Sequence, residues 1–247
     1  LARTYSLLLG LTHRAQNYLI YRGSRTGLSK SLVNDYLCLD GKPVAAHPEH
    51  SDKNLTDEIK DRDPRLAQTI WCPGDLRYGV GEEPLYFELP FLNLTGEQHC
   101  TTGYQLKKGS DPYCVDTENA ETGVIVFRYA EALLNYAEAA NEYYGPDHKD
   151  VLGDQEISPY IVLRKIRECA GIEPGEDGTY GIENNMSQAD MTEAIRLERR
   201  LDLAFEGHRF FDVRRWMIAE DTDNRMMHGF EITRNGERKT GRIIDTR

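Results

Sequence analysis

The sequence lacks several features that would each have placed it in a recognisable class of protein. Its 247 residues contain no apolar run near the roughly 20 residues that a membrane-spanning helix needs. Cationic residues are scarce, since 30 lysines and arginines stand against 41 acidic residues and the net charge is −11. This acidic balance argues against a nucleic-acid-binding surface and against electrostatic attachment to an anionic membrane.

The usual signatures of catalysis and cofactor binding are also missing. There is no His-Glu-x-x-His motif, no Gly-x-Ser-x-Gly motif, no Walker loop and no Gly-x-Gly-x-x-Gly loop. We therefore expect no cofactor. His47 and His50 lie three residues apart beside Glu49, a spacing that a metal site could use. A solvated polar loop is the interpretation that we favour for this segment.

Cysteine is sparse, and no Cys-x-x-Cys pair occurs. The five cysteines are Cys38, Cys72, Cys100, Cys114 and Cys169. The odd number leaves at least one thiol free, and Cys100 and Cys114 flank a turn region across which they could form a disulfide. The chain opens at Leu1 without an initiator methionine, a basic segment or a hydrophobic signal. We therefore expect it to be a piece of a longer protein.

Turn signals dominate residues 1–120, where seven of the ten prolines lie. Asp40-Gly41 and Pro73-Gly74 mark the clearest turns. Between them, the short apolar runs at 66–71 and 85–89 predict short strands or extended loops. We expect a loop-rich part with few strands over 1–120 and a helical part over 121–220.

Two helices are well marked at the start of the second part. Residues 124–144 have helical periodicity with apolar residues on two faces, which is typical of a helix packed between neighbours, and Gly145-Pro146 ends it. Ser158-Pro159 predicts an N-cap and a first-turn proline for the next helix, and Gly171 predicts its end.

Two more helices are expected further along the chain. One begins near Asp190, with Glu193 completing a capping box, and the other covers 208–219 after a break at Gly207. Charged and aromatic residues alternate across this break. Because arginine forms bidentate, partly buried pairs with carboxylates, we expect an ion-pair lattice that clamps the two helices together, with Arg214 holding a partly buried carboxylate. The charged residues are Glu198, Arg199, Arg200, Glu206, Arg209, Asp212, Arg214 and Arg215.

Six segments resemble motifs of the SusD/RagB family and follow one another in the family's order along the chain. The longest, ERRLDLAFEGHRFFDVRRW at 198–216, is similar to that family's signature, with Asp202 where the family usually has glutamate. The other five segments include two departures from the family pattern, at Leu163 and Glu168. They are YLCLDGKP at 36–43, RDPRL at 62–66, TGY at 102–104, RYAEALLNYAEA at 128–139 and LRKIRECAG at 163–171.

The resemblance implies a fold and a function. The fold would be mainly α, a SusD-like superhelix of tetratricopeptide type with a turn-rich, few-stranded first part. Residues 1–247 would be its C-terminal region, without the N-terminal helical half and the C-terminal tail. The function implied is that of a surface-exposed outer-membrane lipoprotein, anchored upstream of this chain, which binds glycans and delivers them to a SusC-like TonB-dependent transporter. The resemblance implies that the protein is not an enzyme, and we predict no metal-ligating residues.

Ligand residues of this family lie in variable loops, so the motifs do not locate them. Aromatic rings stack on the apolar faces of sugars, while arginine and asparagine bind hydroxyl groups. A polar segment near the start of the chain has this composition, and Trp71 and Tyr78 around Pro73-Gly74 form a second group. The residues of the first group are Asn17, Tyr18, Tyr21, Arg22 and Arg25. Ordinary packing is the alternative role for each aromatic.

Two other functions stay open from the sequence. The chain could be a helical-repeat protein-interaction module without a small ligand. It could also be a glycoside hydrolase that uses Glu131 and Glu138, which are seven residues apart on one helix face. Pairing of these two carboxylates with arginines of adjacent helices is the simpler interpretation.

Overall fold

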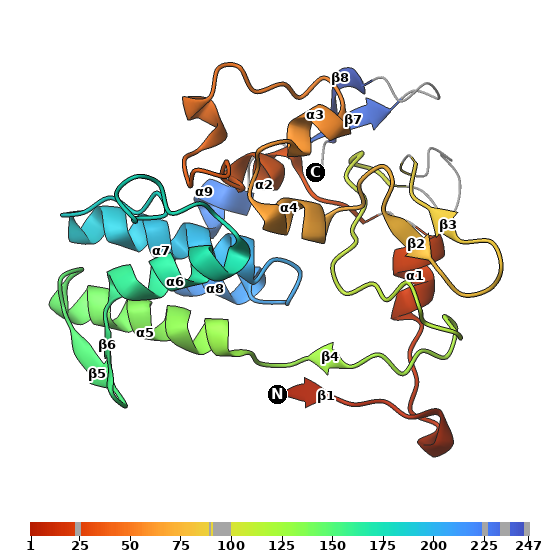
Figure 1. Ribbon diagram of the computed structural model, residues 1–247, viewed down its shortest axis with the longest axis horizontal. Coiled ribbons are helices and arrows are strands. Elements are labelled where there is room, and N and C mark those ends of the chain that lie inside the picture. The colour runs from red at the N-terminus through yellow and green to blue at the C-terminus, as the bar shows by residue number, and fades with distance from the viewer. Residues whose placement is uncertain (23–25, 89, 91–99, 224–226, 233–237, 245–247) are drawn as a thin grey trace.

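The computed structural model describes residues 1–22, 26–88, 90, 100–223, 227–232 and 238–244 (Figure 1). The helices are α1 (Ala15–Tyr21), α2 (Lys30–Asp35), α3 (Leu55–Ile59), α4 (Pro64–Thr69), α5 (Tyr129–Tyr144), α6 (Pro159–Ala170), α7 (Gln188–Asp202), α8 (Arg209–Arg215) and α9 (Ala219–Asp223), with 3-10 turns at Leu7–Leu9 and Val44–Ala46. The strands form antiparallel pairs, β1 (Ala2–Arg3) with β4 (Val124–Ile125), β2 (Leu76–Tyr78) with β3 (Leu85–Tyr86), β5 (Asp150–Leu152) with β6 (Gln155–Ile157) and β7 (Met227–Ile232) with β8 (Arg238–Ile244). The fold is mainly helical, as expected.

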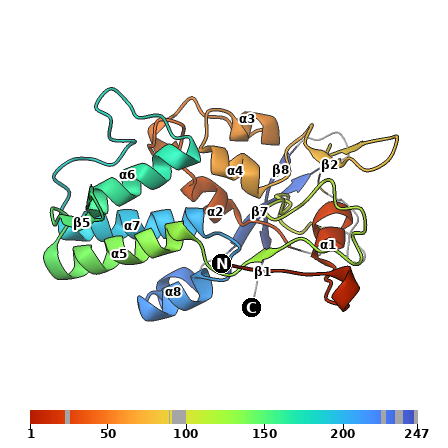
Figure 2. The same ribbon diagram turned by 60° about the horizontal axis from the view of Figure 1, so that its bottom comes forward.

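Helices α5, α6 and α7 pack side by side and form one core (Figures 1 and 2). Their inward residues include Leu134, Leu163, Met191 and Ile195, each at most 1% exposed. A second core lies in the first 120 residues, around buried residues such as Tyr36. Leu201 of α7 belongs to that second core, so α7 is the element that joins the two parts of the molecule.

The predicted boundaries of α6 are confirmed. The Ser158 side chain accepts a hydrogen bond from the backbone N–H of Ile161, and Pro159 occupies the first turn. At the other end, Gly171 has a φ of 89° and donates its N–H to the last turn, which few residues other than glycine can do in that conformation.

Two helix starts differ in detail from the prediction. Helix α7 begins at Gln188, two residues before Asp190, and its N-cap is Ser187, which accepts from the Asp190 N–H, so the predicted capping box of Asp190 and Glu193 is wrong. Helix α5 begins at Tyr129 instead of at residue 124. The β-branched pair Val124 and Ile125 forms strand β4 against β1 instead, as β-branched residues favour extended backbone.

The apolar run 66–71 was expected to be extended, and this prediction is also wrong for most of its length. Residues 64–69 form α4, which Asp63 caps by accepting from the Arg65 N–H and which Pro64 begins. An N-cap followed by a first-turn proline overrides the β-like composition of the run. The run 85–89 does begin as strand β3.

The single helix expected over 208–219 is interrupted. Helix α8 ends at Arg215, and Met217 then takes a φ of 59° before α9 begins at Ala219. A left-handed residue cannot continue a right-handed helix, so the chain turns there.

The expected ion pairing across the Gly207 break is present, and the same charged cluster also reaches other helices. Glu198 is fully buried and pairs with Arg65 of α4 at 2.6 Å and with Arg167 of α6 at 2.9 Å. Arg199 of α7 binds both carboxylate oxygens of Asp212 of α8, at 3.1 and 3.2 Å, across the Gly207 break.

Arg214 does not have the role that the sequence suggested. It is exposed, donates to the Phe210 carbonyl and lies 3.5 Å from the centre of the Phe210 ring. The neighbouring Arg215 holds the carboxylates, because it contacts both Asp212 and Glu138. At the end of a short helix, a shift of one position turns a side chain by about 100° and decides which arginine reaches the carboxylates.

All five cysteines are free, so Cys100 and Cys114 do not form the disulfide that their spacing allowed. Among the described residues, none of the helices is both long and apolar enough to cross a membrane.

Candidate ligand-binding site

Helix α1 and the β2–β3 hairpin bring most of the predicted ligand residues together. The rings of Tyr21, at the end of α1, and Tyr78, at the end of β2, lie 5.5 Å apart between their centres and are tilted by 55°. Tyr18 is 36% exposed, and the Arg22 guanidinium lies 5.9 Å from the centre of its ring. Three tyrosines and an arginine therefore share one surface, although 57 residues separate Tyr21 from Tyr78 along the chain.

The electrostatics of this surface reflect partial burial. Desolvation raises the pKa of the Tyr21 phenol, and the neighbouring Tyr78 hydroxyl raises it further, against an opposite influence of Arg77. The Tyr21 phenol therefore stays neutral at physiological pH and can donate hydrogen bonds. The Tyr78 hydroxyl already lies 3.5 Å from the Val115 carbonyl.

Arg77 fastens the hairpin to the helix. Its side chain is almost fully buried, donates to the Ile20 carbonyl of α1 and packs on the Phe87 ring at 5.8 Å. Desolvation lowers the pKa of Arg77 to about 10, so the group remains a cation at neutral pH. The sequence analysis missed Arg77. Its position next to Tyr78 was the available signal, but only the tertiary structure shows that it reaches α1.

The remaining predicted residues have other positions. Trp71 is fully buried, donates its indole N–H to the Leu19 carbonyl at 3.0 Å and stacks on Phe87, so it supports α1 from beneath. Asn17 is 8% exposed, and its backbone N–H donates to the Thr117 carbonyl. Trp71 thus has the packing role that was its alternative, and Asn17 is buried as well. Arg25 lies outside the described residues.

A hollow of about 490 Å³ lies beside the hairpin. It is lined by Arg77, Pro84, Leu85, Tyr86 and Glu88. Tyr86 is 53% exposed and Leu85 is 41% exposed, so the hollow presents aromatic and apolar groups beside the charged ones. Such a mixture suits a ligand with an apolar face and hydroxyl groups.

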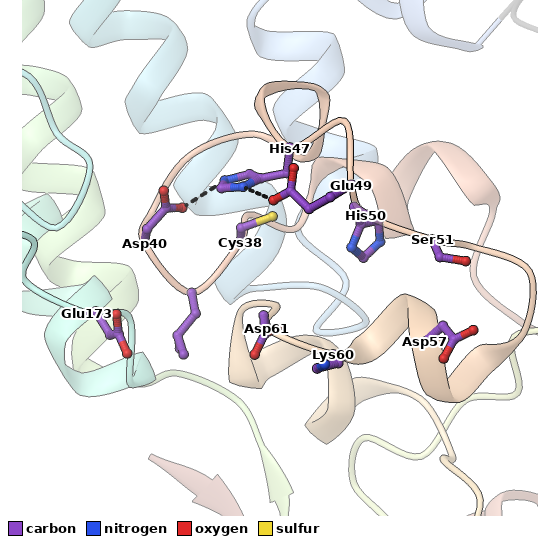
Figure 3. A pocket seen from close by; sticks show the side chains of 11 residues that line it. Cys38, Asp40, His47, Glu49, His50, Ser51, Asp57, Lys60, Asp61 and Glu173 are labelled. Atoms are coloured by element: carbon purple, nitrogen blue, oxygen red, sulfur yellow. Dashed lines mark hydrogen bonds and ion pairs between the residues drawn. The ribbon is translucent and has the colours of Figure 1, made fainter.

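A second hollow, of about 580 Å³, lies in the loop that contains the two histidines (Figure 3). The His47 ring lies between the carboxylates of Asp40 and Glu49, at 3.3 and 3.1 Å. Burial lowers the pKa of the nearby His50, and the positive charge of Arg62 lowers it further. The contacts of His47 with Asp40 and Glu49 therefore hold these two parts of the loop together.

Metal binding finds no support in this loop. In the part of the chain that the structure describes, no group of three or more His, Cys, Asp or Glu residues could hold a metal ion. Five of the eleven residues that line the hollow are acidic, and Asp61 and Glu173 are among them (Figure 3).

A third hollow, of about 740 Å³, lies between α2, α7 and the α8–α9 segment. Its charged lining is largely paired, since Arg200 lies 2.6 Å from Asp35 and Arg196 lies 2.9 Å from Glu193. The sequence analysis did not predict this hollow, because its walls come from segments more than 150 residues apart.

The two carboxylates considered for hydrolysis both have partners. Glu138 binds Arg215 at 2.7 Å and accepts from the Trp216 indole N–H at 2.8 Å. Burial opposes its charged form, but these two hydrogen bonds outweigh that effect and lower its pKa. Glu131 lies 3.5 Å from the His208 ring. A carboxylate with a lowered pKa is poorly suited to act as a general acid.

The arrangement of helices defines a class of protein, because it is shared with solved SusD-like structures. A SusD-like protein from Bacteroides fragilis superposes with a TM-score of 0.65 at 24% identity, over 88% of this chain and 41% of that one. A second solved protein, BT4246, gives a TM-score of 0.65 at 21% identity, over 90% of this chain and 40% of that one. At these identities the likeness concerns the fold.

Sequence comparison identifies the family. A model of the SusD family matches residues 14–247, and the chain therefore belongs to that family. The SusD-like protein P2 of Formosa agariphila is 31% identical over 102 residues, which are 41% of this chain and 18% of that protein. The chain thus spans about two fifths of the length of the solved relatives and a smaller share of this one.

Proposed function

We propose that this chain is part of a nutrient-binding protein of a SusC/SusD-type uptake complex, and that its ligand is a glycan. The observation that carries the proposal is the match of the SusD family over residues 14–247. In this proposal the protein is a surface-exposed lipoprotein of the outer membrane. It passes its ligand to a SusC-like TonB-dependent transporter and does not transform it.

The aromatic surface formed by Tyr18, Tyr21, Arg22 and Tyr78 is the proposed glycan site. The exposed Tyr18 ring and the Tyr21–Tyr78 pair offer apolar faces for sugar C–H groups, while the phenols and the guanidinium offer hydrogen bonds to hydroxyl groups. Arg77 and Trp71 hold α1 and the hairpin together from below, so the surface is formed before the ligand arrives. Trp71 and Asn17 support the site and do not contact the sugar.

Calorimetry with a panel of glycans tests this proposal. We expect saturable binding of at least one glycan, and Tyr21→Ala should weaken it by about tenfold or more, since a stacking aromatic is worth about 1.4 kcal/mol or more at such a site. Tyr129→Ala is the matched control, because Tyr129 is 63% exposed on a different element. Equal losses of affinity in both variants would contradict the proposed site. An absence of binding across the panel would contradict the proposed glycan-binding function.

The second candidate is a protein-interaction module without a small ligand. Exposed apolar side chains on α8, with Phe210 58% and Phe211 67% exposed, favour contact with another protein surface. A protein that binds no glycan but forms a stable complex whose affinity falls on Phe211→Ala would support this candidate. Release of reducing ends from a bound glycan, lost in Glu131→Gln, would instead support a hydrolase.

A further inference from the structure

The C-terminal end of α5 carries a second aromatic surface, which the proposed site does not use. Tyr143 is 80% exposed and Tyr144 is 63% exposed, and their rings meet edge to face with centres 4.5 Å apart. Together with His148, which stacks on Tyr144, the two tyrosines form what we call the α5-end platform.

The Tyr144 ring is held in place although it is exposed. It stacks on the His148 ring with centres 3.9 Å apart and planes only 15° apart. The His148 Nε2 atom lies 3.1 Å from the Oδ2 atom of Asp150. The same Oδ2 atom accepts a hydrogen bond from the Tyr136 hydroxyl at 2.9 Å.

These contacts also fasten the β5–β6 hairpin to α5. The Tyr136 hydroxyl lies 3.2 Å from the Ile157 carbonyl as well as from Asp150, so it joins the helix to both strands of the hairpin. An exposed aromatic ring whose orientation is already fixed loses little conformational entropy when a ligand stacks on it. The platform is therefore organised for binding and differs from a freely rotating surface side chain.

We propose that the α5-end platform is a second saccharide-binding surface, on which a sugar ring of a long glycan stacks on one of the two tyrosine rings and contacts the other from the side. This inference rests on the proposed glycan-binding function. Sugars combine an apolar C–H face with a rim of hydroxyl groups. The platform offers the matching pattern, with two aromatic rings flanked by exposed polar residues such as Asp147 and Lys149.

The position of the platform determines how long a ligand must be to contact both proposed surfaces. The C-terminal end of α5 and helix α1 lie at opposite ends of the longest axis of the molecule (Figure 1). A short oligosaccharide cannot reach both surfaces, whereas a polysaccharide can contact both and gains affinity from the second contact by effective concentration. The platform should therefore matter for polysaccharide and leave the binding of a short oligosaccharide at α1 unchanged.

The test compares two ligands of one glycan in four proteins. Binding of a polysaccharide and of its short oligosaccharide is measured for the wild type, Tyr143→Ala/Tyr144→Ala, Tyr21→Ala and the control Tyr129→Ala. The double variant should bind the polysaccharide about five- to tenfold more weakly and the oligosaccharide within twofold of the wild type. Tyr21→Ala should lose the oligosaccharide but keep weak polysaccharide binding. An unchanged melting temperature shows that the double variant is folded.

The outcomes separate this inference from the proposed function. If the wild type binds both ligands and Tyr21→Ala loses the oligosaccharide, but the double variant binds polysaccharide as the wild type does, the platform is not a binding surface and the proposed function stands. If the wild type binds neither ligand, both proposals fall. An equal loss in Tyr129→Ala would also overturn the inference, because the effect would then not be specific to the platform.

Discussion

The carboxylate of Glu198 shows how one residue can hold several helices. It is fully buried in α7 and receives guanidinium groups from α4 and α6. Burial opposes its charged form, but Arg65 and Arg167 outweigh that effect and hold its pKa below the usual range. A buried pair of this kind gives little net stability over apolar packing, yet loss of one partner leaves charges unpaired in the core.

We therefore predict that Glu198→Gln destabilises the protein by about 3–5 kcal/mol, since two buried arginines would then face a neutral amide. Urea unfolding followed by circular dichroism measures this change. Glu193→Gln is the control on the same helix, because Glu193 is 74% exposed and its pair with Arg196 should contribute less than about 1 kcal/mol. Similar losses in the two variants would contradict the scaffold role of Glu198.

Adjacent arginines on α8 should differ in their effect on stability. Arg215→Ala removes the partner of Glu138 and one partner of the buried Asp212, which should cost about 1–3 kcal/mol. Arg214→Ala removes only an exposed contact with Phe210, which should cost about 0.5–1 kcal/mol. Melting temperatures of the two variants measure the difference, and a larger loss for Arg214 would restore the original sequence-based assignment.

At the scale of elements, local signals determine where the helices begin and end. The cap of α6 is the clearest case, since Ser158 is 4% exposed and accepts from the Ile161 N–H. Where such a signal is combined with a proline, as in Asp63-Pro64, it forms a helix even in an apolar run that resembles a strand. Pairing with a distant strand instead keeps Val124 and Ile125 out of α5.

Ser158→Ala should destabilise the protein by about 1 kcal/mol, because the first turn of α6 loses its side-chain acceptor. Equilibrium unfolding in urea measures the loss. Ser158→Thr retains a hydroxyl acceptor and should recover most of the stability. If alanine and threonine behave alike, the cap contributes through packing and not through its hydrogen bond.

The whole molecule is acidic, and several of its carboxylates depend on ion pairs. In Glu138, Glu198 and Glu206, burial opposes the charged form, but basic partners lower the folded-state pKa below the ordinary value of 4.5. Glu206 accepts hydrogen bonds from two basic side chains, those of Arg128 and Lys108. In the unfolded chain these groups take up protons near 4.5, before the folded protein does.

The contribution of these groups to stability should therefore be constant above about pH 5 and fall steadily as the pH decreases below 4.5 towards the folded-state pKa values. Urea midpoints between pH 7 and pH 3 measure the effect. Glu198→Gln should show a shallower fall than the wild type, because one of the responsible groups is gone. A midpoint that stays constant down to pH 3.5 would contradict this assignment.

The sequence alone determined the mainly helical class, the caps of α6 and the family, because all of these depend on residues close together along the chain. Spacing and short motifs carry that information directly. The aromatic composition of the first segment likewise pointed to Tyr18, Tyr21 and Arg22.

The tertiary structure decided which of those candidates share a surface. Trp71 and Tyr78 have similar sequence surroundings, yet Trp71 is buried beneath α1 and Tyr78 packs beside Tyr21. In the same way, Arg215 and not Arg214 faces the core carboxylates. Burial and pairing arise from the packing of segments more than 50 residues apart, and the sequence of one segment contains no record of which side chain its distant neighbour will cover.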